Sequence, residues 1–296
     1  MSTRWPVPTT SPAAEPGPSL PRPYRKRSVR HRRDRVAAVG RRDLQTRTAE
    51  QIREAVTESS VIVLPLGAIE QHGPHLPVNT DTLIADAVAT SGAELAAAQG
   101  VDVWLLPALT FTKSNEHSHF SGSFSLSAST LMATLDDLAR SITMLRARRL
   151  VFLNGHGGNS TLVATMNREI RLRYGLQTFL THPGLPPDQG GKSPASELGM
   201  GIHGGVEETS MLLSLRPDLV HMDRATRNVP ERLNDNRYVR FGGSVAFGWL
   251  ADDFGPDGHI GDPTPATAQL GDTLLAGAAE GFAAALGEIA TFNFGR

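Results

Sequence analysis

The sequence predicts an α/β protein in which a mostly parallel β-sheet is flanked by helices. Two observations indicate this fold. Short apolar runs of strand length alternate with longer segments of helical periodicity, and the runs are apolar throughout rather than at every second residue. Strands that alternate with helices are joined by right-handed crossovers, which make the strands parallel and cover both faces of the sheet. The pattern has no internal repeat, so we expect a single domain over residues 41–296.

The elements follow one another in a regular order. Val61–Leu66 carries no polar side chain, which is typical of a strand buried on both faces. The other expected strands are 103–106, 150–153 and 177–181, and the expected helices are 82–99, 131–145, 160–174 and 266–290. Residues 184–201 and 228–261 lack periodicity, so we expect loops there that form the walls of an active site or contacts between subunits.

Residues 1–40 are expected to form a disordered basic arm. Seven of the twenty prolines fall in the first 23 residues, and little there can build a core. Residues 1–42 hold eleven Lys or Arg against Glu15 and Asp34, a net charge of +9, whereas the whole chain has a net charge of −1. A nucleic-acid-binding or scaffold protein that uses this arm is the non-enzymatic alternative, and we favour a solvated arm over it.

The composition limits the catalytic and metal-binding groups that the chain can use. The chain has no cysteine, which excludes disulfides, thiolate metal sites and cysteine nucleophiles and agrees with a cytoplasmic location. No uninterrupted apolar run approaches the ~18 residues of a membrane span, so no membrane partner is expected. The chain also lacks a Gly-x-Ser-x-Gly elbow and a Walker loop. A metal in this protein must therefore be bound by His, Asp and Glu.

The first polar cluster follows the strand Val61–Leu66. Glu70 and His72 are two residues apart, so in an extended chain they point to the same side. Two prolines then turn the chain, which lets Asp81 return beside them at the start of the next helix. Two carboxylates and an imidazole that converge on one point make a site for zinc, manganese or iron.

The second cluster, Asn-Gly-His-Gly-Gly-Asn at 154–159, directly follows the strand expected at 150–153. A dinucleotide-binding loop is excluded because Ser160 stands where the third glycine of that motif is required. In parallel sheets, ligands bind at the carboxyl ends of the strands. His156 is therefore a candidate metal ligand at such an end.

The third cluster consists of His203, Glu207 and Glu208, which precede an apolar segment at 211–215. Both carboxylates are candidate site residues. They would suit the first turn of a helix equally well, because the helix dipole stabilises negative charge there. From the residues alone, both interpretations of Glu208 stay open.

These clusters resemble the signatures of the creatininase (creatinine amidohydrolase) family. Residues 67–81 are similar to the leading signature, and 154–159 and 203–210 are similar to the second and third. Weaker similarities lie at 114–122 and 258–263. The resemblance runs in order from about residue 45 to residue 290.

The resemblance implies a creatininase-like α/β fold with a two-metal centre. It implies hydrolysis of a C–N bond in a cyclic amide, a linear amide or a peptide by a metal-activated water. Glu70, His72, Asp81 and His156 fall on ligand positions for one or two Zn²⁺, Mn²⁺ or Fe²⁺ ions, with Asp81 as the bridge. His203 falls on the position of a proton-transferring histidine. The partners implied are a small-molecule amide and further copies of the chain, often as a hexamer.

Three further residues are candidates for contacts with the substrate. Ser114 and His117 belong to the weaker similarity at 114–122, and Glu207 belongs to the third signature. For His117 a structural role beside the pocket is an equal alternative, and for Glu207 a plain surface carboxylate is the alternative. These residues complete the predicted site.

The chain departs from creatininases at one ligand. Creatininases carry a ligand glutamate two residues after the histidine of the second signature, where this chain has Gly158. We expect Glu208 to serve the second ion instead, or that ion to bind weakly. Glu208 is thus a predicted ligand and a predicted catalytic residue.

A second departure concerns the substrate. Creatininases close their pocket with tryptophans between the second and third signatures, and none of Trp5, Trp104 and Trp249 lies in that interval. An amide other than creatinine is therefore favoured. Relatives include a peptidase of the mycofactocin precursor and a formamide deformylase with a phosphorylated substrate. The deformylase is disfavoured because Lys113 is the only nearby basic residue in the pocket motifs.

Overall fold

The computed structural model describes residues 42–184 and 195–295, so the arm expected at 1–40 lies outside the described residues. Four strands form one parallel sheet in the order β2-β1-β3-β4. They are β1 (Val61–Leu66), β2 (Val103–Leu105), β3 (Arg149–Asn154) and β4 (Gln177–Thr181). The predicted parallel sheet is confirmed, with β2 one residue shorter and β3 one residue longer at each end than the sequence predicts.

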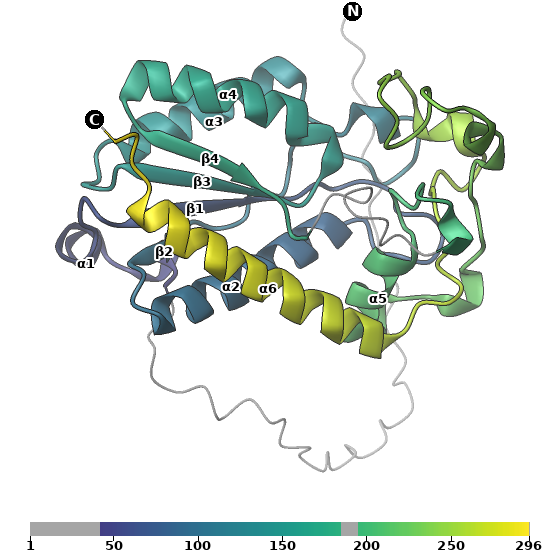
Figure 1. Ribbon diagram of the computed structural model, residues 1–296, viewed down its shortest axis with the longest axis horizontal. Coiled ribbons are helices and arrows are strands. Elements are labelled where there is room, and N and C mark those ends of the chain that lie inside the picture. The colour runs from purple at the N-terminus through teal and green to yellow at the C-terminus, as the bar shows by residue number, and fades with distance from the viewer. Residues whose placement is uncertain (1–41, 185–194, 296) are drawn as a thin grey trace, which may run out of the picture. The chain divides into compact units, whose positions relative to one another are not determined.

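Helices cover both faces of the sheet. Figure 1 shows α3 and α4 on one face and α2 and α6 on the other. The helices are α1 (Ala49–Ala55), α2 (Thr80–Ala98), α3 (Ala128–Ile142), α4 (Ser160–Tyr174), α5 (Val206–Leu215) and α6 (Ala268–Thr291). The sequence patterns did not predict α1. It begins with a capping box, in which Thr48 and Gln51 each accept a hydrogen bond from the other's backbone N–H.

Side chains of the central strands alternate between two apolar layers. Val61 and Val63 of β1 point into the layer shared with α2 and α6, and Ile62 and Leu64 point into the layer shared with α3 and α4. All four are at most 2% exposed. Since complete burial of such a side chain stabilises a fold by about 1.5–3 kcal/mol, the two layers hold β1 rigidly in the centre of the sheet.

Pro65 lies inside β1, although a central strand rarely tolerates proline because it lacks an N–H. β1 pairs with β2 only at residues 61–63, whereas it pairs with β3 over all six of its residues. The Pro65 carbonyl accepts a hydrogen bond from Leu109 N at 2.9 Å, on the β2 side. The missing N–H therefore faces the side on which β2 has already ended.

Among the described residues, α6 is the one helix long and apolar enough to cross a membrane by length and composition. It contains no long uninterrupted apolar run, because Gly, Thr and Glu interrupt the helix. Phe282 and Leu286 of α6 are buried in the same layer as α2, and α6 contacts both α2 and α5 closely. One side of α6 therefore packs on the core of the domain.

Two glycines let α2 begin against the carboxyl ends of β1 and β3. A Cβ atom on Gly67 would lie 2.2 Å from Thr82 Oγ1 and 2.5 Å from Thr82 Cα. A Cβ atom on Gly155 would lie 2.8 Å from the Asp81 carbonyl oxygen. A side chain at either position would push α2 away. The glycines thereby place Asp81, in the first turn of α2, over the ends of the two strands.

Candidate metal centre

Asp81 lies between two imidazole rings. Its Oδ1 is 3.1 Å from His72 Nε2, and its Oδ2 is 3.1 Å from His156 Nδ1. All three side chains are buried. Glu70 Oε1 is 3.3 Å from His156 Nδ1 and 4.0 Å from His72 Nε2. We refer to His72 with Asp81 Oδ1 as the His72 half of the cluster, and to His156 with Asp81 Oδ2 and Glu70 as the His156 half.

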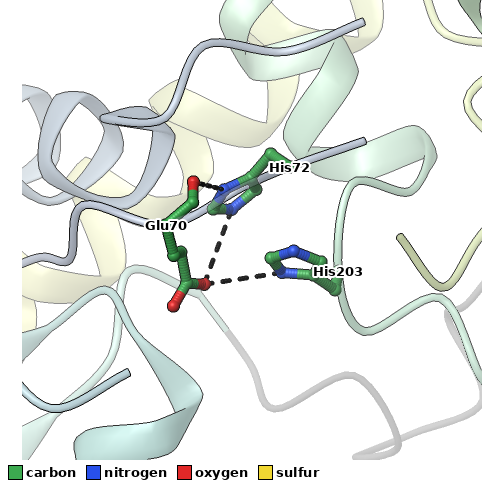
Figure 2. A group of neighbouring side chains, drawn as sticks. All are labelled: Glu70, His72 and His203. Atoms are coloured by element: carbon green, nitrogen blue, oxygen red, sulfur yellow. Dashed lines mark hydrogen bonds and ion pairs between the residues drawn. The ribbon is translucent and has the colours of Figure 1, made fainter. Parts of the chain in front are cut away.

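Backbone carbonyls fix the proton position on both rings. His72 Nδ1 donates to the Glu70 carbonyl at 3.1 Å (Figure 2), and His156 Nε2 donates to the Lys113 carbonyl at 2.9 Å. Because a carbonyl oxygen can only accept, the ring protons are on these two nitrogens. In the neutral rings, His72 Nε2 and His156 Nδ1 then direct lone pairs toward carboxylates. Lone pairs of a ring nitrogen and a carboxylate oxygen repel each other at these distances. The arrangement therefore requires either a second proton on each ring or a cation between each ring nitrogen and the carboxylates.

The electrostatics of the cluster favour positive charge. Burial lowers the pKa of His72, but Asp81, together with Glu208 and Glu70, raises it to about 10. Burial also lowers the pKa of His156, yet Glu70 and Asp81 raise it well above its usual value. Asp81 Oδ2 is buried and accepts no hydrogen bond within the described part of the chain. The residues therefore fit divalent cations, which imidazole and carboxylate ligands bind together.

Glu208 lies in the first turn of α5 and also in the His72 half. Its Oε2 accepts a hydrogen bond from Gly204 N at 2.6 Å and is 3.9 Å from His72 Nε2. His72, Asp81 and Glu208 can each offer one ligand atom within 4.8 Å of the others. The two interpretations left open by the sequence are thus compatible, because one residue is both a helix-start carboxylate and a member of the cluster.

His203 borders the cluster on the side of Glu70. Figure 2 shows the Glu70 carboxylate directed toward the rings of both His72 and His203, and His203 Nδ1 is 3.5 Å from Glu70 Oε1. His203 Nε2 donates to the Gln71 carbonyl at 2.6 Å. Burial lowers the pKa of His203, and nearby His72 lowers it further, well below its usual value. His203 is therefore neutral and presents an acceptor, Nδ1, to the cluster.

The remaining predicted residues differ in their placement. The buried Ser114 hydroxyl donates a hydrogen bond to Glu70 Oε2. His117 stacks on His203 with ring centroids 4.1 Å apart, and His117 Nε2 is 3.7 Å from Glu70 Oε1. Both residues thus position Glu70 and the His203 ring. Among the described residues, no hydrogen bond or ion pair joins Glu207 to the cluster, although this residue lies next to Glu208 on α5.

Two residues that the sequence patterns did not single out also lie at the cluster. Glu116 Oε1 is 3.3 Å from His156 Nε2, and Gln71 Nε2 is 3.0 Å from His117 Nδ1. Glu116 lies inside the motif at 114–122, which is the signal that could have identified it. Gln71 lies between two predicted ligands in the chain, and its backbone carbonyl fixes the His203 ring.

An aromatic wall formed by Phe241, Phe247, Trp249 and Phe254 borders the cluster. Trp249 meets the His117 ring edge-on with centroids 6.0 Å apart, and it packs on Phe241 at 5.6 Å and on Phe254 at 5.8 Å. The four side chains are half-buried. They come from 228–261, the segment in which the sequence predicts a wall of the site. No local sequence signal placed Trp249 near His117.

Comparison with known proteins identifies relatives over most of the chain. The family model for creatinine amidohydrolase matches residues 45–286. The mycofactocin precursor peptide peptidase of Mycobacterium tuberculosis is 36% identical over 251 residues, which cover 82% of this chain and 88% of that protein. The creatinine amidohydrolase of Pseudomonas putida is 39% identical over 186 residues, 57% of this chain and 70% of that one.

Solved structures agree in fold. A crystal structure of creatinine amidohydrolase (creatininase) superimposes with a TM-score of 0.68 and 26% identity, covering 86% of this chain and 100% of that one. A manganese creatininase gives a TM-score of 0.65 with 28% identity over 83% of this chain and 98% of that one. The residues matched by the family model, 45–286, include the four strands and all three polar clusters.

Proposed function

The chain belongs to the creatininase family of metal-dependent hydrolases that act on C–N bonds, and we propose that it holds two divalent cations and cleaves a peptide bond. The observation that carries this proposal is the position of Asp81, whose two oxygens each face the lone pair of a different imidazole. In the proposed centre, His156 and Glu70 would hold one ion, His72 and Glu208 would hold the other, and Asp81 would serve both. Zinc, manganese and iron all suit this set of ligands.

Proton transfer from the attacking water to the leaving nitrogen is assigned to side chains of the protein. Divalent cations held by these residues would supply a water of lowered pKa and would polarise the substrate carbonyl. The amide nitrogen leaves poorly as an anion, so it must gain a proton as the C–N bond breaks. His203 Nδ1 is free to take a proton from the attacking water, and it can then give that proton to the leaving nitrogen. The hydrogen bond from His203 Nε2 to the Gln71 carbonyl holds the ring in this orientation.

Two observations favour a peptide over creatinine as the substrate. The relatives named as peptidases match more of this chain than the creatinine amidohydrolase of Pseudomonas putida does, 82% against 57%. The aromatic wall also offers apolar surface beside the cluster, which suits a bulky apolar side chain of a peptide. A cyclic amide is the second candidate, favoured by the 39% identity to the creatinine amidohydrolase.

A direct assay tests the proposal. Protein loaded separately with zinc, manganese and iron is incubated with short peptides that differ in the residues flanking one bond, and in parallel with creatinine. We expect cleavage of peptides with a large apolar residue next to that bond. Turnover of creatinine without any peptide cleavage would reject the peptide substrate, and failure to bind metal would reject the centre itself. Light scattering on the same samples tests the expected homo-oligomer.

A further inference from the structure

His75 is a buried histidine in the loop between β1 and α2, and the proposed mechanism does not use it. Its side chain is completely buried. His75 Nε2 lies 3.1 Å from the Gly204 carbonyl oxygen and 3.1 Å from Thr209 Oγ1. Because a carbonyl oxygen can only accept, the ring proton is on Nε2 and is donated to Gly204. The His75 backbone carbonyl also accepts a hydrogen bond from His221 N at 2.9 Å. His75 therefore joins the loop after β1 to the segment that contains α5.

The His75 ring has only this one N–H to donate. Its Nδ1 is buried and has no hydrogen-bond partner within the described residues. Burial and the neighbouring His259 lower the pKa of His75 to about 4, so the ring is uncharged at neutral pH. His259 is equally buried, but its Nε2 donates to the Thr226 carbonyl at 2.8 Å. The two rings thus hold different backbone carbonyls.

Gly204 connects the His75 ring to the cluster. Its φ of +67° lies in the left-handed region, which glycine adopts at no steric cost. Gly204 N donates to Glu208 Oε2 at 2.6 Å, whereas the Gly204 carbonyl accepts from His75. The two peptide groups that flank the Gly204 Cα are therefore each held by one side chain. Because glycine has unusually wide backbone freedom, loss of either hydrogen bond releases the turn more than it would at another residue.

The same turn carries His203, which has its own backbone contacts. His203 N donates to the Ile260 carbonyl at 3.1 Å, and Ile260 N donates to the His203 carbonyl at 2.7 Å. The turn is thus fixed at His203 by Ile260 and at Gly204 by His75. Since Ile260 holds His203 independently, a change at His75 should displace Glu208 rather than His203.

We infer that His75 is a positioning residue, which holds the Gly204 carbonyl and thereby fixes the Glu208 carboxylate in the His72 half of the cluster. His75 acts on this carboxylate through the backbone of Gly204. The inference rests on the proposed function, since its consequence is expressed through metal binding by Glu208.

Two substitutions of His75 test the inference. His75→Gln keeps an N–H donor near the place of Nε2, whereas His75→Leu keeps a buried side chain without a donor. Calorimetric titration with Mn²⁺ and elemental analysis count the ions, and hydrogen exchange follows residues 203–208. We expect two ions in the wild type and in His75→Gln. In His75→Leu we expect loss of one ion and exchange at 203–208 that is faster by on the order of tenfold, because a buried carbonyl loses its donor.

His259→Leu is the matched control, since it removes the same kind of hydrogen bond from an equally buried ring. We expect it to lower the melting temperature as His75→Leu does, but to keep both ions. A role of His75 in stability alone would give the two Leu variants the same metal content. That result would overturn the inference, as would loss of an ion in His75→Gln or two ions of unchanged affinity in His75→Leu.

A further measurement uses the wild type, so it does not depend on the folding of His75→Leu. In protein labelled with ¹⁵N at histidine, long-range ¹H–¹⁵N spectra distinguish the two tautomers of each ring. His75 should carry its proton on Nε2, with slow exchange of that proton, in metal-free and in Zn²⁺-loaded protein. A proton on Nδ1 would overturn the inference. Wild-type protein that binds no metal would reject the proposed function, and the His75 tautomer and the exchange at 203–208 would still decide the role of His75.

Discussion

The cluster joins two regions of the molecule that are built in different ways. Glu70, His72, Asp81 and His156 belong to the sheet side, which consists of the segments that follow β1 and β3. These strands are paired in register up to Leu66 and Asn154, so the two segments leave the sheet side by side. Two apolar layers hold the strands. The positions of these candidate ligands therefore follow from strands that are packed on both faces.

The loop side, residues 195–262, supplies His203, Glu208 and the aromatic wall without any strand of the sheet. It is organised around Glu197, which is 1% exposed. Glu197 Oε1 accepts hydrogen bonds from Val206 N at 2.9 Å and from Asp262 N at 2.8 Å. One buried carboxylate thus ties the start of α5 to the segment that ends at residue 262. On the sheet side, apolar packing of the strands positions the candidate ligands. On the loop side, a few hydrogen bonds position His203 and Glu208. A segment held by so few contacts unfolds locally more easily than the packed sheet.

The largest effect should come from the residue on which both halves of the cluster depend. Asp81→Ala removes the shared carboxylate from the sheet side, and no nearby group replaces it. We expect loss of both ions and a fall of activity to background. Elemental analysis and peptide turnover check this, with Asp137→Asn on the exposed face of α3 as the control that keeps both. Full metal occupancy in Asp81→Ala would show that the carboxylate is not shared.

His203→Ala separates proton transfer from metal binding. Because the proposed centre holds its ions from the sheet side and by Glu208, we expect this variant to keep its metal and to lose activity by about 10²–10⁴-fold. The loss should shrink for substrates whose leaving nitrogen is less basic, since they need less protonation. Metal content and kcat are measured together. If metal is lost with His203, the histidine is a ligand, as its proximity to Glu70 and His72 also permits.

Glu197→Ala should weaken the loop side alone. The change leaves the Val206 and Asp262 amides without their buried acceptor, and each such amide costs about 1–3 kcal/mol. We expect faster hydrogen exchange over 195–262 and loss of the ion in the His72 half, since Glu208 moves with this segment. Exchange of the sheet and the ion in the His156 half should be unchanged. Uniformly faster exchange throughout the domain would contradict the division into two sides.

Trp249→Ala should have the smallest effect. The aromatic wall is proposed to contact the substrate, and one aromatic contact contributes about 0.5–1.5 kcal/mol, or roughly 2–10-fold in KM. Metal content and kcat should stay unchanged. Steady-state kinetics on a peptide with a large apolar residue provide the measurement, with Phe294→Ala near the C-terminal end as the control. A fall in kcat without a change in KM would place Trp249 in a different role.

The sheet side was largely predictable from the sequence, whereas on the loop side the sequence indicated His203 and Glu208 but not the contacts that place them. The apolar runs at 61–66 and 150–153 give the parallel strands, and ligands at strand ends follow because the carboxyl ends of parallel strands share one edge. Glu116 and Trp249 reach the cluster from turns whose course no periodicity specifies. The resemblance predicts proton transfer by His203, but the ring nitrogen that is free could not be predicted, because a backbone carbonyl of Gln71 decides it.

Three glycines surround the Glu197 carboxylate, which leaves no room for a side chain at any of the three positions. A Cβ atom would lie 1.9 Å from Glu197 Oε2 at Gly201, and 2.4 Å and 2.9 Å from Oε1 at Gly205 and Gly261. A larger residue at any of the three glycines would clash with the Glu197 carboxylate. A smaller residue at Glu197 would leave a cavity and two backbone amides without their acceptor. The four positions are therefore sterically coupled, and we expect a substitution at one of them to be tolerated only together with a compensating change at another.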